Sequence, residues 1–388
     1  MKLLVTDADA RAALAATRAL GRAHLVHVAG PGRTSLAGTS RFAVAHHRAA
    51  DPLAAPEAFA REIQALCASL GIDLVLPVTD GAMLALGSSR DALRPARLMA
   101  AGYEAYARLS DKHALAQLAR GAGIETPRGG RVRDPESALA LARELGFPVV
   151  VKPVVSVLRD DAGRLCKPEV VRIASEPALP EAFARAGAGG EALLQECVEG
   201  WGEGLSLFRW QGRTLAAFAH RRLREMPPGG GVSVLAESIA VDAERLACVE
   251  ALLDGVGYQG VAMAEFKANE RRAVLIEINA RLWGSLQLAI DAGIDFPSLL
   301  VAAFSGARPA PAAAYRSGVR LRSEFGDLDH ALALARGRGA PGAPTGLRAA
   351  LGVLLRPAGP DCRWELLRRE DPRPFCRALL RWLARRPL

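Results

Sequence analysis

A run of apolar residues near position 275 is interrupted by two polar side chains, and this interruption limits what the chain can fold into. The segment AVLIEIN, residues 273–279, has the composition of a buried β-strand except at Glu277 and Asn279. Side chains two residues apart on a strand point to the same face, so Glu277 and Asn279 are predicted to project together. Burying a carboxylate without a partner is costly or forces its protonation. The strand therefore predicts a cation on that face.

A second apolar strand precedes this one and carries a carboxylate of its own. Residues 261–268 have the sequence VAMAEFKA, and the polar turn NERR separates them from the later strand. If the two strands form a hairpin, Glu265 lies beside Glu277 and Asn279 and faces the same pocket. Oxygen ligands in this number suit Mg²⁺, which takes one or two carboxylates together with substrate phosphates. Ion pairs with nearby arginines such as Arg281 are the structural alternative, and the residues alone leave both interpretations open.

Lysine is rare in this chain, and nearly all of the basic residues are arginine. Lys112 falls in the first turn of a predicted helix, where a cation opposes the helix dipole. Lys152 ends the apolar run FPVVV and precedes a proline, at the edge of a predicted buried strand. Both positions suit a lysine that reaches an external anion, and both are also compatible with a surface lysine whose stem covers apolar residues.

Strands and helices alternate over the first hundred residues, which predicts a small doubly wound α/β domain. The turn after its first strand, TDAD, has none of the glycines that a dinucleotide fold needs near the pyrophosphate. From about residue 109 the pattern changes to helices and antiparallel strands, and the stretch ARPAPAAAYRSG marks a further boundary. We expect three units, at residues 1–105, 106–306 and 307–388.

Composition argues against several classes of function. No run reaches the roughly 18 apolar residues of a membrane span, and acidic residues near the N-terminus interrupt any signal peptide. The six cysteines lack CxxC spacing and do not cluster with histidine, which argues against a zinc site and a disulfide framework. We therefore expect a soluble, cytoplasmic protein that does not bind a membrane.

The formal net charge of +9 raises the question of nucleic acid binding. However, the arginines are spread along predicted helical surfaces rather than collected with aromatic residues. The densest basic group, in CRALLRWLARRPL, has apolar residues at helical spacing and predicts an amphipathic helix packed on the body with a solvated basic face. We expect no nucleic acid partner.

The motif AEFK, followed twelve residues after Glu265 by IEINARLWGS, resembles the ATP-grasp superfamily of carboxylate ligases. The resemblance runs from about residue 109 to residue 306. It implies an α/β fold (an α+β ATP-grasp unit), with a doubly wound α/β domain before a two-lobed ATP-grasp domain and a small C-terminal region. It also implies ATP and two Mg²⁺ ions, with Mn²⁺ as a substitute, held by Glu265, Glu277 and Asn279.

The same resemblance assigns further roles by position. Arg281 matches an arginine near the transferred phosphate and the acyl substrate, and Lys112 and Lys152 match lysines that contact the nucleotide. Arg281 and Lys152 are the implied catalytic residues. The segment LLQECVEGWGEG looks like an adenine hinge, in which Glu196 and the backbone near Val198 would meet adenine. Glu203 would then accept hydrogen bonds from the ribose hydroxyls.

Two segments depart from the pattern of the family. After VKP, where many relatives have a glycine-rich lid, the sequence VVSVLRDDAGRLCKPEVV predicts a long hairpin turning at DDAG. A glycine-rich segment occurs later, in PPGGGVS, and could either wrap a phosphate or form a flexible surface loop. By analogy, we expect PPGGGVS and the earlier loop TDGA to face the substrate.

The implied reaction is ATP-dependent ligation of a small carboxylate to an amine through an acyl phosphate, with an amino acid or peptide-like substrate. The alternative is a non-catalytic or sensor-type ATP-binding protein of the same fold. Many members of the family are homodimers, which is an expectation from the family alone. The sequence identifies neither the carboxylate nor the nucleophile.

Overall fold

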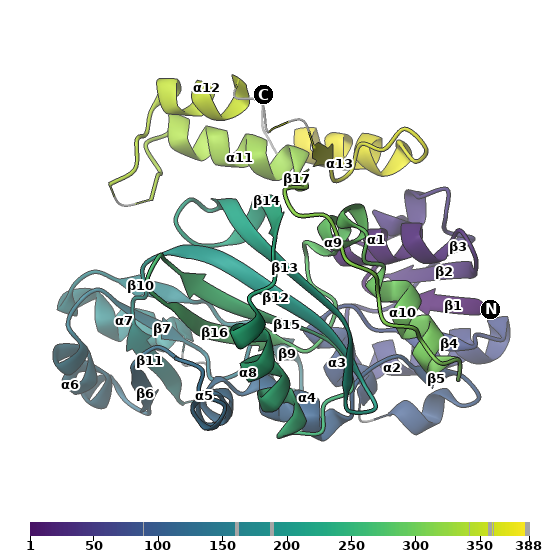
Figure 1. Ribbon diagram of the computed structural model, residues 1–388, viewed down its shortest axis with the longest axis horizontal. Coiled ribbons are helices and arrows are strands. Elements are labelled where there is room, and N and C mark those ends of the chain that lie inside the picture. The colour runs from purple at the N-terminus through teal and green to yellow at the C-terminus, as the bar shows by residue number, and fades with distance from the viewer. Residues whose placement is uncertain are drawn as a thin grey trace.

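The computed structural model describes residues 1–87, 89–159, 163–186, 190–340, 342–355, 359 and 361–384. Figure 1 shows a small lobe at the left, a large curved sheet at the centre and the N-terminal domain at the right, with the C-terminal helices above. The order of these parts agrees with the predicted fold class, an N-terminal doubly wound domain followed by a two-lobed unit.

The N-terminal domain contains a parallel sheet with strand order β3-β2-β1-β4-β5. Alternating side chains of β1 pack on opposite faces, with Leu3 beside α1 and Leu4 beside Phe59 of α2, so the domain is doubly wound as predicted. The strand order reverses between β1 and β4, and ligands of such sheets bind beyond the carboxyl ends at this point. Its strands and helices are β1 (Lys2–Val5), α1 (Arg11–Leu20), β2 (Leu25–Gly30), η1 (Ala37–Thr39), β3 (Ala45–Arg48), α2 (Pro56–Leu70), β4 (Leu74–Leu76), α3 (Asp80–Gly87), η2 (Arg90–Leu93) and β5 (Arg97–Leu98).

The small lobe is an antiparallel sheet with strand order β10-β7-β11-β6, covered by α6 and α7. Val149 and Val151 of β7 point into this core, which explains the apolar run that the sequence shows before Lys152. The lobe and its approach consist of α4 (Tyr103–Ser110), α5 (Lys112–Gly121), β6 (Gly129–Val132), α6 (Pro135–Leu145), β7 (Val149–Lys152), β10 (Val171–Ile173), η3 (Glu176–Ala178), α7 (Leu179–Ala186) and β11 (Ala192–Glu196). The predicted boundary at residue 105 falls inside α4.

A hairpin follows β7, as the sequence predicts for the VVSVLRDDAGRLC segment. Its strands, β8 (Leu158–Arg159) and β9 (Leu165–Cys166), pair antiparallel. Most of the predicted DDAG turn, residues 160–162, lies outside the described residues. The Leu165 amide donates a hydrogen bond to the Leu53 carbonyl of the N-terminal domain, so this hairpin spans from the small lobe to the first domain.

The large sheet has the order β16-β15-β12-β13-β14-β17-β18 and is antiparallel except between β17 and β18. β12 and β13 join through Gln211 and Gly212, which both have positive φ, as a two-residue hairpin turn of right-handed twist requires. The elements are β12 (Trp201–Trp210), β13 (Arg213–Met226), β14 (Val232–Ile239), α8 (Ala243–Asp254), β15 (Gly260–Ala268), β16 (Ala273–Asn279), α9 (Leu286–Ala292) and α10 (Phe296–Phe304).

The C-terminal region extends the large sheet and also contacts the N-terminal domain. It contains β17 (Arg320–Arg322), α11 (Glu324–Ala335), α12 (Leu347–Leu355), β18 (Cys362–Trp364) and α13 (Arg373–Ala384). Two basic residues of α13 contact the N-terminal domain: Arg377 donates to Thr34, and Arg381, which stays exposed, pairs with Asp9 at 2.8 Å. These contacts draw the basic residues of α13 toward the N-terminal domain.

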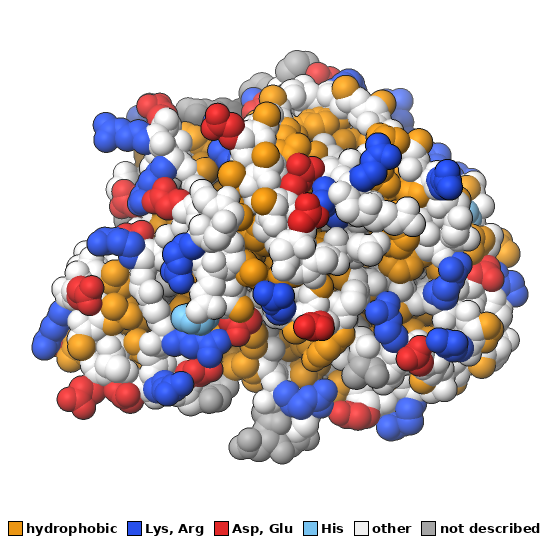
Figure 2. Space-filling view, turned by 60° about the horizontal axis from the view of Figure 1, so that its bottom comes forward, with side chains coloured by type: hydrophobic (Ala, Val, Ile, Leu, Met, Phe, Trp, Pro, Cys, Tyr) orange, Lys and Arg blue, Asp and Glu red, His pale blue; other side chains and the backbone are white. Residues whose placement is uncertain are grey.

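The surface shows no concentration of basic charge on the face in Figure 2. Among the described side chains there, Lys and Arg are interspersed with Asp and Glu. No single helix of the described residues is long and apolar enough to cross a membrane, and α9 and α10 pass that test only as a pair bent by 95°.

A buried ion pair joins the C-terminal region to the N-terminal domain, and its removal is expected to destabilise the fold. Asp371 is fully buried and accepts hydrogen bonds from Arg18 Nε at 2.8 Å, Ser40 Oγ at 2.7 Å and the Arg41 amide at 2.9 Å. Asp371→Ala leaves the Arg18 charge buried without its partner, which we expect to lower the free energy of unfolding by about 3–5 kcal/mol. Urea denaturation measures this loss.

The neighbouring residue provides the control. Glu370 pairs with Arg22 where both side chains are about half exposed, so Glu370→Ala should cost at most about 1 kcal/mol. Equal losses in the two variants would contradict the assigned role of Asp371.

Candidate functional site

The two predicted carboxylates lie directly opposite each other on neighbouring strands. Glu265 of β15 pairs in register with Glu277 of β16, next to a bulge that follows Glu265. The Asn279 side-chain amide donates to Glu265 Oε1 at 2.9 Å and to Glu277 Oε1 at 3.4 Å. The structure thus brings together the three residues that the sequence predicts as metal ligands.

The chemistry of this group fits a hard cation. Burial raises the pKa of the Glu265 carboxyl; the Arg222 guanidinium opposes this effect and the Glu277 charge adds to it. In the described part of the chain, no three His, Cys, Asp or Glu side chains cluster as metal ligands, so the set consists of two carboxylates and one amide. Such a set leaves positions for water and phosphate oxygens, as Mg²⁺ sites on nucleotides do.

Arg281 is held by a carboxylate of the N-terminal domain. Its Nη2 lies 2.8 Å from Asp80 Oδ2 and donates to Asn279 Oδ1 at 2.8 Å, and its Nη1 donates to the Leu282 carbonyl at 2.9 Å. Asp80 begins α3 and also accepts from Tyr106 Oη at 2.9 Å. Burial lowers the pKa of Arg281, but the Asp80 charge outweighs this effect, so the guanidinium stays charged. The sequence did not indicate Asp80 as its partner, although it marked the TDGA loop that contains it.

Arg222 is a site residue that the sequence analysis did not assign. Its Nη2 lies 2.5 Å from Glu265 Oε2. Gly204 of β12 pairs with both His220 and Glu265, so Arg222, two residues beyond His220, lies on the Glu265 face of the sheet. The sequence AHRRL shows that His220 and Arg222 lie two residues apart and so share a face of their strand. Placing that face beside Glu265 also requires the register of β12, β13 and β15.

The two predicted lysines converge on Glu277. Lys112 is the first residue of α5; its Nζ lies 4.0 Å from Glu277 Oε2 and donates to Ser156 Oγ at 2.9 Å. Lys152 ends β7, and its Nζ lies 3.5 Å from the Ile276 carbonyl of β16. Their relative exposures are 6% and 5%, so neither is a surface lysine.

Burial of these lysines leaves their charges poorly compensated. Burial and the Lys112 charge lower the pKa of Lys152, Glu277 acts in the opposite direction, and the result is a pKa of about 8. Burial also lowers the pKa of Lys112, with Glu277 and Asp80 opposing the shift. The two ammonium groups therefore share Glu277, for which no ion pair with an arginine of the described residues is present. This is the electrostatic condition for binding an anion.

The predicted hinge connects the small lobe to the large sheet. Glu196 ends β11, and its carboxylate accepts from the Arg128 amide at 3.2 Å and from Arg128 Nε at 2.9 Å. Burial raises the pKa of Glu196, but the Arg128 hydrogen bonds outweigh this and hold it below the usual value. Val198 follows in the half-buried linker before β12, and no main-chain hydrogen bond to the described residues involves it. The backbone at Val198 is thus available to a ligand.

Glu203 is not brought to this group. Because its neighbour Gly204 pairs with Glu265, Glu203 points to the opposite face of the large sheet. It accepts hydrogen bonds there from Arg245 at 2.7 Å and from Trp201 Nε1 at 2.6 Å. Burial raises the pKa of Glu203, but these donors and the Arg245 charge hold it below its usual value. Its ribose contact stays a prediction that this arrangement does not favour.

A cavity of about 420 Å³ adjoins Arg281 at the carboxyl ends of β1, β2 and β4. Both loops that we expected to face the substrate contribute to it, TDGA through residues 79–81 and PPGGGVS through Val232. The β8–β9 hairpin region contributes Val157 and Lys167. The cavity therefore lies at the switch point of the N-terminal sheet. Arg281 lines it and also contacts Asn279, one of the proposed metal ligands.

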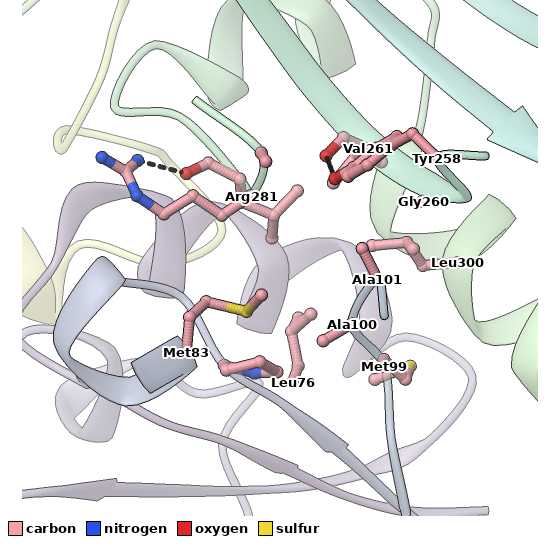
Figure 3. Close-up of a pocket in the computed structure, with 13 residues that line it drawn as sticks. Leu76, Met83, Met99, Ala100, Ala101, Tyr258, Gly260, Val261, Arg281 and Leu300 are labelled. Atoms are coloured by element: carbon pink, nitrogen blue, oxygen red, sulfur yellow. Dashed lines mark hydrogen bonds between the residues drawn. The ribbon is translucent and has the colours of Figure 1, made fainter. Parts of the chain in front are cut away.

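A second, apolar crevice lies on the other side of the Arg281 backbone. It measures about 10 Å³ and separates Leu76 and Met83 of the N-terminal domain from Val261 and Leu300. Figure 3 shows that the Arg281 guanidinium points away from these apolar side chains. A space of this size holds about one water molecule, so the crevice is a packing contact between domains.

The sequence comparisons cover parts of the chain. Residues 191–324 match a family model described as "ATP-grasp in the biosynthetic pathway with Ter operon". Over 220 residues, which are 53% of this chain and 20% of the relative, the chain is 29% identical to the carbamoyl phosphate synthase large chain of Thermus thermophilus. Over 106 residues, 27% of this chain and 9% of the relative, it is 28% identical to that of Archaeoglobus fulgidus. The chain thus spans a fifth or less of the length of these relatives.

Solved structures share the fold over most of the chain. A biotin carboxylase from Campylobacter jejuni in complex with an ATP analogue has a TM-score of 0.63 at 16% identity, covering 82% of this chain and 74% of that one. N5-carboxyaminoimidazole synthetase from Staphylococcus aureus has a TM-score of 0.62 at 14% identity, covering 81% and 79%. The chain therefore has the ATP-grasp fold, and its resemblance to the ATP-grasp superfamily is confirmed.

Proposed function

We propose that this protein is an ATP-dependent ligase, which activates a small carboxylate as an acyl phosphate and transfers the acyl group to an amine. The observation that carries the proposal is the charge balance of the site. Arg281 pairs with Asp80 and Arg222 with Glu265, which leaves two buried lysines beside Glu277. A polyphosphate would supply the missing negative charge.

The proposed reaction has two steps. A substrate carboxylate oxygen attacks the γ-phosphorus of ATP, and the bond to the β-phosphate oxygen breaks to release ADP. The amine then attacks the acyl carbonyl, inorganic phosphate leaves, and the amine gives up a proton. Such transfers need positioning and charge neutralisation rather than a protein nucleophile.

The residues of the chain divide these tasks. Lys112 and Lys152 would hold phosphate oxygens, and the backbone near Val198 would meet adenine. Arg281, at the junction of the metal ligands and the cavity, would orient the transferred phosphate and the acyl group. We assign two Mg²⁺ ions to Glu265, Glu277 and Asn279; when bound, they neutralise phosphate charge.

Other parts of the proposal rest on the comparisons alone. Among the similar structures is a biotin carboxylase domain dimer from Hydrogenobacter thermophilus, with ADP, magnesium and bicarbonate. We include a homodimer and small carboxylate and amine substrates in the proposal on this basis. Size-exclusion chromatography with light scattering tests the dimer.

Glu277→Gln tests catalysis against a protein that only binds nucleotide. Loss of one charged metal ligand at the phosphates should lower the rate of ADP formation by at least about a hundredfold. Release of ADP from Mg²⁺-ATP in the presence of pooled carboxylates and amines measures the effect. Glu270→Gln, in the exposed turn of the same hairpin, is the control and should leave the rate unchanged. An unaltered rate in Glu277→Gln would favour the non-catalytic alternative.

Lys152 predicts a pH dependence of nucleotide binding. Its pKa of about 8 means that the free protein loses the ammonium charge above that pH, whereas bound phosphate favours the charged form. The dissociation constant for Mg²⁺-ATP should therefore rise by up to about tenfold per pH unit above pH 8 and stay flat below it. Calorimetry between pH 7 and pH 9.5 measures this.

Lys152→Arg provides the matched control, because arginine stays charged over this range. We expect the alkaline rise to disappear in this variant. An identical rise in both proteins would assign the titration to another group.

A further inference from the structure

The walls of the 420 Å³ cavity are mostly apolar away from Arg281. They come from the ends of the N-terminal strands, the β8–β9 hairpin region and the loop between β13 and β14. The apolar residues that line it include Pro31, Pro52, Leu53, Phe59, Val157 and Val232. The volume falls within the range of small-molecule sites.

The carboxylates in the wall already have donors. Asp7 accepts from Thr79 Oγ1 at 2.8 Å and from the amides of Val78 and Thr79 at 3.2 Å. Asp80 is paired with Arg281 at 2.8 Å. Asp80 therefore has little remaining demand for a cationic ligand. Asp7 is held by neutral donors, and burial raises the pKa of its carboxyl.

The other two carboxylates are satisfied at the edge of the cavity. Asp9 pairs with Arg381 at 2.8 Å and accepts from the Leu36 amide at 3.0 Å. Asp51 is exposed and accepts from the Leu53 amide at 2.8 Å. Water can solvate Asp51, so neither side chain places an unmet negative charge inside.

The basic side chains of the cavity differ in how they are paired. Arg11 is held by Glu365 at 2.7 Å and donates to the Ser233 carbonyl at 3.0 Å. Lys167 differs: it is exposed, and within the described residues no ion pair or hydrogen bond of its side chain is present, so an anion bound to it would replace only water. It lines the same cavity as Asp80 and Arg281.

We propose that this cavity binds the carboxylate substrate as a monocarboxylate with an uncharged, largely apolar body, and that Lys167 contacts its carboxylate. The assignment rests on the proposed ligase function and defines the class of its substrate. The carboxylate would lie between Lys167 and Arg281, next to the proposed phosphate site, and the body would extend along the apolar wall. A second charge on that body would be buried among apolar residues without a partner, so diacids and diamines bind more weakly.

Four probes of equal chain length test the charge and the body separately. Binding of hexanoate, hexanamide, hexylamine and adipate to the full chain is measured by calorimetry, with Mg²⁺ and a non-hydrolysable ATP analogue present. We expect hexanoate to bind at least about tenfold more tightly than the other three. Equal binding of hexylamine or adipate, or no binding of hexanoate, overturns the proposal.

Variants then test the role of Lys167. Lys167→Gln should weaken hexanoate about tenfold and leave hexanamide unchanged, whereas Lys167→Arg should retain most of the affinity. Arg133→Gln removes an exposed positive charge on the small lobe and should change nothing. An unchanged hexanoate affinity in Lys167→Gln overturns the contact.

The same titrations separate this inference from the proposed function. If the ATP analogue fails to bind the unaltered chain, the ligase proposal fails. If the ATP analogue binds the unaltered chain and Lys167→Gln with equal affinity, and hexanoate also binds both with equal affinity, only the substrate assignment fails.

Discussion

The contact of Arg281 with Asp80 joins two domains at the point where the candidate chemistry occurs. Asp80 belongs to the N-terminal domain, and Arg281 follows β16, which contains Glu277 and Asn279. The 2.8 Å ion pair therefore fixes the N-terminal domain relative to β16. The same guanidinium occupies Asn279 Oδ1, which turns the amide nitrogen toward Glu265. An amide offers its oxygen to a cation and its nitrogen to a carboxylate. A cation bound there must therefore reorient Asn279, and that reorientation is coupled through Arg281 to the N-terminal domain.

The local sequence pattern was sufficient to predict the structure where it depends on neighbouring residues of one strand or hairpin. The period of two in AVLIEIN placed Glu277 and Asn279 on one face, and the polar turn before it brought Glu265 opposite Glu277. The apolar run before Lys152 gave the buried strand β7, and the alternation at the N-terminus gave the doubly wound domain. What the pattern could not give was the partner of each charge. Arg222 contacts Glu265 because of the register of β13 with β12. Asp80 contacts Arg281 from another domain. Neither contact can be predicted from the residues next to it in the sequence.

Glu203 shows that spacing alone does not determine the face of the sheet on which a residue lies. Seven residues separate it from Glu196, but the linker between β11 and β12 passes from one sheet to another within that interval. A linker of irregular residues does not preserve the alternation of faces, so the count from Glu196 cannot determine which face Glu203 occupies. Only the pairing of Gly204 with Glu265 settles it. The arginines that surround Glu203 then explain how its carboxylate is stabilised on the helix-covered side.

The segment from Lys152 to Lys167 connects the two halves of the candidate site. Lys152 lies at the proposed phosphate position and Lys167 lines the cavity, and the chain between them contacts both domains. The Lys112 amide donates to the Val154 carbonyl at 2.9 Å, and the Leu165 amide donates to the Leu53 carbonyl at 2.8 Å. These two hydrogen bonds tie the segment to α5 at one end and to the N-terminal domain at the other. Because both contacts are main-chain hydrogen bonds, this connection between the two parts of the site does not depend on the side chains that lie between them.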